Sequence, residues 1–326
     1  MSNDELTPLL VTVFTPAYNR AHTLPDLYES LYKQTDMNFE WLVIDDGSGD
    51  KTAELVHSWM SNSRFPIRYY YQENSGKHIA YNWALALAQG QLFWPIDSDD
   101  LAVPISIERI RYHWTKIQEE RSKAKAISFL LYTANGERLN EDYSQPIFEA
   151  RLPQLIYQGI IKHDVWVVFE INSARLFSFS EQYRQIYVPE RTILYAFSAA
   201  YLTRFINERL GIYRCNSADT SRMSNFSRLE RLKTGGAISL FLQHWSQLNF
   251  GRRYLWHYLK FHSLSAIHFH RFASLAGIGL RDRLGRITDP FMRYFVAIFW
   301  PLGWLAAGFT LIKYHRAMSQ ARNDSG

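Results

Sequence analysis

The first hundred residues alternate between apolar runs that suit buried strands and amphipathic segments that suit helices. The apolar runs are Leu9–Thr15, Phe39–Ile44, Ile67–Tyr71 and Leu92–Ile96. The helical segments between them are 24–31, Thr52–Met60 and Ile79–Ala88. Strands and helices in this rhythm form a mostly parallel sheet with helices on both faces. Ligands of such sheets bind beyond the carboxyl ends of the strands. The residues directly after each apolar run are therefore candidates for a binding site.

Acidic residues follow two of these runs. Asp45 and Asp46 come directly after the second run, and Asp97, Asp99 and Asp100 follow the fourth. Carboxylates this close repel one another unless a cation lies between them. A hard divalent ion such as Mg²⁺ or Mn²⁺, bound through oxygen atoms and bridging to phosphate, meets that requirement. The pattern predicts a site for a metal-diphosphate ligand at one edge of the sheet.

Composition limits the other classes of function only mildly. The chain has 326 residues and a formal net charge of +5, which suits anionic partners without selecting among them. No dense basic stretch occurs before residue 250, so we expect no nucleic-acid partner. The one cysteine, Cys215, has no partner for an intrachain disulfide, which favours a reducing compartment. We expect Cys215 to be a small core residue.

The middle of the chain is less regular. Val103–Lys123 has the spacing of a helix, and two short apolar runs, Ala126–Tyr132 and Val165–Ile171, predict further strands. We expect a helix over Arg191–Leu210, ended by Gly211. The sequence contains no internal repeat and no low-complexity segment.

After about residue 240 the chain becomes aromatic and helical in pattern. Leu240–Leu280 contains several histidines, and the spacing of four of them matches no standard metal-ligand pattern, which favours packing over metal binding. These are His257, His262, His268 and His270. Tyr294–Ile312 then runs for 19 residues without a charge, close to the length that spans a bilayer. Pro301 and basic residues on both sides favour an interfacial helix or re-entrant hairpin at least as much as a span. The remaining alternative is a packed helix of the core.

Five short motifs together resemble glycosyltransferase family 2. They are Thr15-Pro16-Ala17-Tyr18-Asn19-Arg20, Asp45-Asp46-Gly47-Ser48, Asn74 to Asn82, Asp97-Ser98-Asp99-Asp100 and Val188-Pro189-Glu190. Each motif is weak alone, but their order and strand context make a specific signal over roughly residues 8–235. The resemblance implies a GT-A type fold, an α/β nucleotide-binding sandwich. We therefore expect a catalytic domain at 1–235, with a nucleotide-binding half at 8–123 and an acceptor half at 124–235. A helical, membrane-associated extension at 236–326 would complete the chain.

The resemblance also implies roles for individual residues. Asp99 would be the principal metal ligand, with Asp97 on the ion, its water or the donor's ribose. The donor-binding set is Pro16, Ala17, Tyr18, Arg20, Asp45, Asp46, Lys77, Asn82, Asp97 and Ser98. Asp100 is either an orienting residue or a cap for the following helix.

Several of these positions have simpler alternatives. Asp45 and Asp46 would accept from a uracil N3–H or merely form a turn, and Tyr18 is either a base contact or a core aromatic. Lys77 would contact phosphate at a helix start or be a solvated lysine. In the loop before it, Ser75 stands where the family often has a glycine, which weakens the inference of a phosphate-binding loop. The segment Asn216–Ser224 is either a flap or a surface loop.

Glu190 is the expected general base, which takes a proton from the acceptor hydroxyl as that oxygen attacks the anomeric carbon. Its alternative role is a charge that stabilises the start of a helix. Asp164 and Glu181 are the other candidate carboxylates.

These residues predict an inverting, metal-dependent glycosyltransferase that uses a nucleotide-sugar, expected to be UDP-linked, and a glycan or lipid-linked acceptor. Met1–Pro8 lacks the basic and apolar regions of a signal peptide. From the motif set and the apolar C-terminal segment we expect the protein at the cytoplasmic face of a membrane. Two alternatives are a catalytically silent nucleotide-sugar binder or assembly protein, and a sugar nucleotidyltransferase. The absence of glycine from Thr15–Arg20 counts against the latter. The sequence leaves the oligomeric state open.

Overall fold

The computed structural model describes residues 10–214, 236–250 and 252–323. The chain divides into two compact units that interleave along the sequence. The first unit comprises Met1–Gln185 and Ala200–Asn216, and the second comprises Ile186–Ala199 and Ser217–Gly326. Cys215 and the expected flap or loop at Asn216–Ser224 lie outside the described residues.

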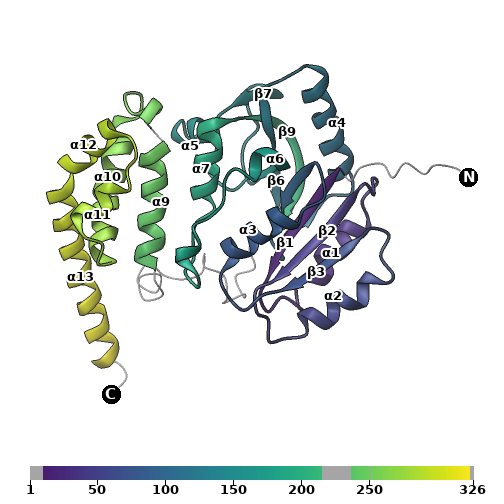
Figure 1. Ribbon diagram of the computed structural model, residues 1–326, viewed down its shortest axis with the longest axis horizontal. Coiled ribbons are helices and arrows are strands. Elements are labelled where there is room, and N and C mark those ends of the chain that lie inside the picture. The colour runs from purple at the N-terminus through teal and green to yellow at the C-terminus, as the bar shows by residue number, and fades with distance from the viewer. Residues whose placement is uncertain (1–9, 215–235, 251, 324–326) are drawn as a thin grey trace, which may run out of the picture. The chain divides into compact units, whose positions relative to one another are not determined.

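A mixed sheet forms the centre of the first unit, with strand order β3-β2-β1-β4-β8-β6-β9-β5 and β7 paired to β9 (Figure 1). The strands are β1 Val11–Ala17, β2 Phe39–Asp45, β3 Ile67–Tyr71, β4 Leu92–Pro95, β5 Leu101–Ala102, β6 Ala124–Thr133, β7 Ile147–Ala150, β8 Trp166–Glu170 and β9 Leu202–Tyr213. The first four strands pair in parallel, as the alternating pattern predicts. Antiparallel β8 then joins this half to β6, so the sheet is mixed overall.

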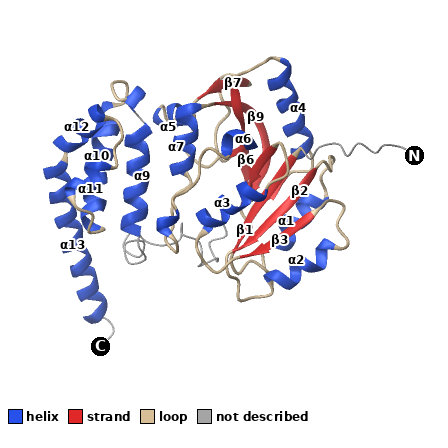
Figure 2. Cartoon of the chain, in the orientation of Figure 1, coloured by secondary structure: helices blue, strands red, loops and turns tan. Residues whose placement is uncertain are grey.

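Helices cover both faces of the sheet in the first unit (Figure 2). They are α1 Leu24–Tyr32, α2 Thr52–Met60, α3 Lys77–Leu87, α4 Ser106–Glu119, α5 Leu152–Tyr157 and α6 Ile171–Ala174, with a 3₁₀ turn at Glu181–Tyr183. Successive strand residues point to opposite faces. Val13 packs in the cluster that contains Leu27 of α1, whereas Phe14 meets Tyr81 of α3. Burial on both faces explains why these strands are continuous apolar runs.

The prediction of one helix over Arg191–Leu210 is wrong. Helix α7 (Arg191–Ala200) ends at Ala200, and the residues that follow form strand β9. This strand pairs in parallel with β6 and antiparallel with β7, and its Phe205 and Ile206 are fully buried. The apolar spacing of 202–213 fits either period locally, and pairing on both sides decides for the strand. Gly211 lies within β9 and therefore ends no helix, and an added Cβ there would lie 2.2 Å from the Trp166 ring.

The described part of the second unit is helical. It contains α7, α9 Gly236–Phe250, a 3₁₀ turn at Arg252–Tyr254, α10 Leu259–Leu275, α11 Leu280–Gly285, α12 Pro290–Ile298 and α13 Trp300–Asn323. Helix α10 packs between α9 and α13 (Figure 1). The uncharged run Tyr294–Ile312 falls across α12 and α13, which bend by 53° at their junction. Among the described residues no single helix is long and apolar enough to cross a membrane, while this bent pair meets the length and composition criteria jointly.

Candidate functional site

The ends of β1, β2 and β4 place the acidic clusters at one edge of the sheet. In the parallel register Ala17 pairs with Asp45, and Phe14 pairs with Pro95. The turns that begin at Tyr18, Asp46 and Asp97 therefore all lie at the same edge of the sheet, beyond the carboxyl ends of the strands. This confirms the expectation that both acidic clusters share one rim, which is the carboxyl-end position where ligands of such sheets bind.

Hydrogen bonds join the loop after β1 to the loop after β2. The backbone N–H of Asn19 donates to Ser48 Oγ (2.8 Å), and Asn19 Oδ1 accepts from the Gly49 N–H (2.8 Å). The Arg20 N–H donates to Thr52 Oγ1 (2.9 Å). Asn19 itself has a φ of 54°, in the left-handed region that asparagine tolerates. These contacts present Tyr18 at the rim with 47% of its surface exposed, so it is not a core aromatic.

Asp45, at the end of β2, is held by two hydrogen bonds to its carboxylate. Asp45 is buried; its Oδ1 accepts from the Ser48 N–H and its Oδ2 accepts from the Tyr69 hydroxyl, both at 2.7 Å. Burial, together with this bond to a carboxylate, raises the pKa of Tyr69. Both carboxylate oxygens thus shape the turn, and a donor contact by Asp45 stays a prediction.

Asp46 organises the loop that leads into α3. Its Oδ1 accepts from Gln72 Nε2 (2.6 Å) and from the Ser75 N–H (2.8 Å), and its Oδ2 accepts from the Gly76 N–H (2.9 Å). Its own N–H donates to the Ala17 carbonyl (2.7 Å). Through its backbone N–H and its buried carboxylate, Asp46 therefore connects the end of β1 to the glycine before Lys77.

Lys77 and Asp97 form an ion pair across the rim. Lys77 is the first residue of α3, after Gly76 with a φ of 100°. Both side chains remain partly exposed, so the pair lies where solvent or a ligand has access. The lysine expected to contact phosphate and the first aspartate of the acidic turn are thus neighbours.

The acidic turn is held by a residue that the sequence reasoning missed. The Arg214 N–H donates to Asp100 Oδ1 (3.1 Å), and Arg214 Nε donates to the Asp99 carbonyl (2.8 Å). The Arg214 guanidinium also pairs with Asp26 of α1 (2.5 Å). Arg214 directly follows β9, so recognising that segment as a strand was the signal needed to find it. Asp100 is buried and orients the turn, and Asp99 is half-buried.

The remaining donor-binding candidates of the first unit have mainly structural contacts. Asn82 holds the segment after α6, since its Oδ1 accepts from the Phe179 N–H (2.8 Å) and its Nδ2 donates to the Phe179 carbonyl (2.9 Å). Pro16 and Ala17 end β1, and Ser98 is buried within the acidic turn. Their contacts with a donor stay predictions.

The candidate bases fall in different units. Glu190 belongs to the second unit, where it is exposed directly before α7 and its carbonyl accepts from the Ile193 and Leu194 N–H groups. Glu181, in the first unit, pairs with Arg184 (2.8 Å), whose other nitrogen donates to Ser75 Oγ (3.3 Å). Asp164 is exposed before β8.

The chemistry of the rim fits a divalent ion shared with a substrate. Within the described residues, no three His, Cys, Asp or Glu side chains gather to hold a metal by themselves. Mg²⁺ normally binds through one or two carboxylates and completes its shell with water and substrate phosphates. Asp97 and Asp99 provide carboxylates of that kind at an accessible edge.

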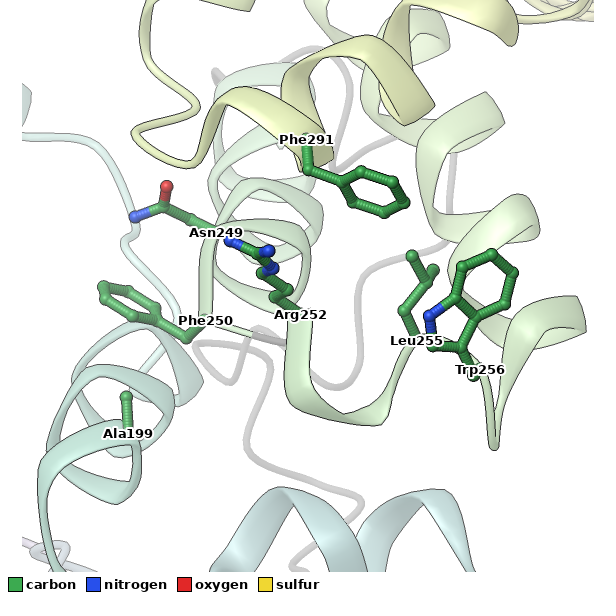
Figure 3. A pocket seen from close by; sticks show the side chains of 7 residues that line it. All are labelled: Ala199, Asn249, Phe250, Arg252, Leu255, Trp256 and Phe291. Atoms are coloured by element: carbon green, nitrogen blue, oxygen red, sulfur yellow. The ribbon is translucent and has the colours of Figure 1, made fainter.

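A separate open hollow of about 560 Å³ lies in the second unit (Figure 3). Its lining is Ala199, Asn249, Phe250, Arg252, Leu255, Trp256 and Phe291. None of the predicted donor, metal or catalytic residues lines it, so the hollow gives no support for a donor site there.

Comparisons with known proteins agree with the motifs. The model of the family described as Glycosyl transferase family 2 matches residues 12–183. An uncharacterized glycosyltransferase of Rickettsia felis is 38% identical over 108 residues, covering 33% of this chain and 18% of that protein. The glycosyltransferase GlyG of Streptococcus pneumoniae is 32% identical over 112 residues, covering 34% and 36%. The chain thus matches only a minor part of either relative's length.

Solved structures share the fold at low sequence identity. Residues 1–349 of S. aureus TarS, in complex with UDP-GlcNAc, superpose with a TM-score of 0.59 at 15% identity, over 92% of this chain and 90% of that one. The mannosyltransferase PcManGT of Pyrobaculum calidifontis, with GDP-Man and Mn²⁺, gives 0.51 at 15% identity, over 94% and 88%. With more than half of its length matched by the family model, the chain belongs to glycosyl transferase family 2 and has a GT-A type fold.

Proposed function

We propose that the chain is an inverting, metal-dependent glycosyltransferase at the cytoplasmic face of a membrane, which transfers a sugar from a UDP-linked donor to a glycan or lipid-linked acceptor. The observation that carries the proposal is the shared rim. There the turn Asp97–Asp100 lies beside Lys77, and Lys77 begins the helix whose entry loop Asp46 holds.

Asp99 and Asp97 would hold Mg²⁺ or Mn²⁺ against the donor diphosphate, where the ion stabilises the negative charge of the leaving group. The protein's own residues prepare that position. Arg214 holds the acidic turn through the Asp99 carbonyl and the Asp100 carboxylate. Lys77 lies beside Asp97 with its ammonium at the rim, where it would pair with a phosphate oxygen once a donor is bound.

Glu190 would act as the general base. It takes the proton of the acceptor hydroxyl while that oxygen forms a bond to the anomeric carbon and the bond from that carbon to the diphosphate oxygen breaks. Attack from the side opposite the leaving group inverts the anomeric configuration. The exposed position of Glu190 before α7 supports access to an acceptor.

The nature of the substrates rests on the neighbours. TarS binds UDP-GlcNAc and PcManGT binds GDP-Man, so a nucleotide-sugar is the natural donor. The chondroitin synthase of Escherichia coli is 26% identical over 182 residues, covering 54% of this chain and 24% of that protein. That likeness supports a glycan acceptor.

Replacement of the metal ligand tests the proposal. We expect Asp99→Ala to abolish transfer and hydrolysis of UDP-sugars in the presence of Mn²⁺, since charge on the departing diphosphate is no longer balanced. The circular dichroism and melting temperature should stay close to those of the parent. Glu137→Ala, an exposed carboxylate of the same unit, is the matched control and should keep full activity.

A companion variant separates catalysis from silent binding. Glu190→Gln should lower turnover by roughly 10²–10⁴-fold, the usual contribution of a general base, with donor affinity retained. Donor binding without turnover in either protein would favour the silent binder, and equal turnover in both would rule out Glu190 as the base. Full activity of Asp99→Ala with a chelator present would overturn the metal-dependent mechanism.

A further inference from the structure

Helix α13 has its small residues facing the protein and its large apolar residues facing outward. Gly303, Ala307 and Thr310 form the buried stripe of its described part. The outward residues are Trp300, Leu302, Trp304, Leu305, Phe309, Leu311 and Ile312, each 41–67% exposed. A helix on the surface of a water-soluble protein has the opposite arrangement, with its large apolar side chains toward the core.

Close packing on α10 requires this orientation. A Cβ on Gly303 would lie 2.3 Å from the His270 Cβ and 2.8 Å from the Ile267 carbonyl oxygen. Further along, Arg271 Nε donates to Thr310 Oγ1 (2.8 Å). No larger side chain fits at the contact, so rotation of α13 cannot bury its tryptophans and phenylalanine. Small residues at a close helix contact with large apolar residues outside are typical of helices surrounded by lipid.

Helix α12 continues the exposed apolar surface. Phe291, Tyr294 and Ile298 follow one another at helical spacing and are 43%, 77% and 73% exposed, while Met292 and Val296 face inward. The Trp256 ring lies 6.2 Å from Phe291 and is itself exposed, and both rings line the hollow in Figure 3. Apolar surface of this extent, with aromatic residues among it, marks a site of interaction rather than ordinary surface.

Charge identifies the partner. Residues 236–326 contain eleven lysines and arginines against three aspartates and no glutamate, whereas the whole chain has a formal net charge of only +5. Exposed Arg281 and Arg293 precede the uncharged run, and exposed Lys313 follows it. Basic residues beside an apolar face suit an anionic phospholipid surface, where each adds to the attraction. An apolar partner protein would need no such excess of charge.

Helix α10 argues for a position on the membrane surface rather than across it. The helix carries Lys260, His262, His268, His270 and Arg271, and it runs beside α13. A spanning α13 would take these polar groups toward the bilayer centre, which is costly. The 53° bend between α12 and α13 also suits a surface position, because within the described residues neither helix alone is both long and apolar enough for a span.

We propose that the outer faces of α12 and α13 insert into the headgroup and upper acyl region of an anionic phospholipid membrane, with α13 lying along the surface. This inference does not depend on the chemistry at the acidic rim, and it would hold for an inactive protein.

Vesicle co-sedimentation of the full-length protein tests it. Vesicles of phosphatidylcholine alone are compared with vesicles that also contain phosphatidylglycerol, at roughly 0.1 M and 1 M NaCl, where the Debye length is about 10 Å and 3 Å. We expect at least tenfold stronger binding to the anionic vesicles at low salt, and weaker but measurable binding at high salt. Vesicles with brominated acyl chains should quench part of the tryptophan fluorescence.

Two variants locate the binding surface. Trp304→Gln with Phe309→Gln should lower binding at least tenfold, because apolar side chains no longer leave water. Leu176→Gln with Ile160→Gln is the matched control, since both residues are exposed apolar positions of the first unit. Arg281→Glu with Lys313→Glu should weaken binding to anionic vesicles only.

Four results would overturn the proposal. The first is no vesicle binding by the parent, and the second is equal binding by the parent and the Trp304 and Phe309 double variant. The third is a dimer in solution that the double variant abolishes while neither protein binds vesicles, which would assign the face to a second copy. The fourth is retention in the membrane after alkaline extraction, which would show a span.

Discussion

At the scale of single residues, the candidate donor site depends on backbone positions as much as on charges. Asp46 accepts from Gln72, Ser75 and Gly76 and so fixes the loop before Lys77. That loop also passes directly over Gly47, which has a φ of 90°. Two loops that are far apart in sequence thus touch backbone to backbone at the rim.

Gly47 provides the sharpest residue-scale prediction. An added Cβ would lie 2.7 Å from the Asn74 backbone nitrogen, and the left-handed φ costs an L-residue about 1–2 kcal/mol. We expect Gly47→Ala to lower the free energy of unfolding by at least that amount and to raise the KM for the donor. Gly49→Ala is the matched control, because nothing lies within 4 Å of its Cβ position. Thermal melts and donor titrations check both, and equal behaviour of the two variants would contradict the account.

At the scale of elements, β9 connects the acidic rim to the rest of the first unit. Its end delivers Arg214 to the acidic turn, and its middle is tied to α4 by Glu208. Arg109 Nη2 and Nε donate to the two Glu208 oxygens at 2.6 Å and 2.7 Å, and buried His113 Nε2 lies 2.8 Å from Oε1. Burial would raise the pKa of Glu208, but the hydrogen bonds from Arg109 and His113 outweigh it and lower the pKa to about 2.

The contacts of Glu208 with Arg109 and His113 predict that the stability of the protein depends on pH. Because the folded pKa of Glu208 lies below its ordinary value, its contribution is complete above about pH 4.5 and is lost as the pH falls toward 2. Glu208→Gln should lower the free energy of unfolding by about 1–3 kcal/mol at pH 7, and the gap to the parent should shrink at pH 3. Urea unfolding measures both values. Glu119→Gln, a surface pair on α4, should change little, and a gap that stays constant with pH would refute the role.

At the scale of the whole molecule, the two units should respond differently to acid. His262 and His270 are buried in α10, and burial lowers the pKa of each to about 4. A lowered histidine pKa means that protonation favours the unfolded chain, so stability is lost as the pH falls from 6.5 toward 4. In the first unit burial also lowers the pKa of one histidine, His78, and Glu208 begins to lose its contribution only below about pH 4.5.

We therefore expect the second unit to unfold first on acidification. Each histidine should cost about 2 kcal/mol at pH 5 relative to pH 8. His262→Phe should remove part of this loss, whereas His163→Phe, at an exposed position of the first unit, should not. Limited proteolysis between pH 8 and 4, with the cleavage sites mapped, gives the order of unfolding. Earlier cleavage in the first unit would contradict the expectation.

Local chemistry alone determined a large part of this protein. The four parallel strands, the helices between them and the acidic rim follow from periodicity and from residue types at strand ends, and the family follows from the resemblance of five short motifs in order. These features need only neighbours in sequence. Two of the predicted elements, Thr52–Met60 and Ile67–Tyr71, match the structure residue for residue.

Only tertiary structure decided the remainder, because it depends on partners far away in the chain. Strand β9 exists through its pairing with β6 and β7, and Arg214 reaches the acidic turn only as a consequence. Likewise, the residues of the uncharged run do not by themselves determine which side of α12 and α13 faces the protein. Contact with α10 at Gly303 and Thr310 selects the small side, and this leaves the tryptophans and Phe309 exposed on the outside.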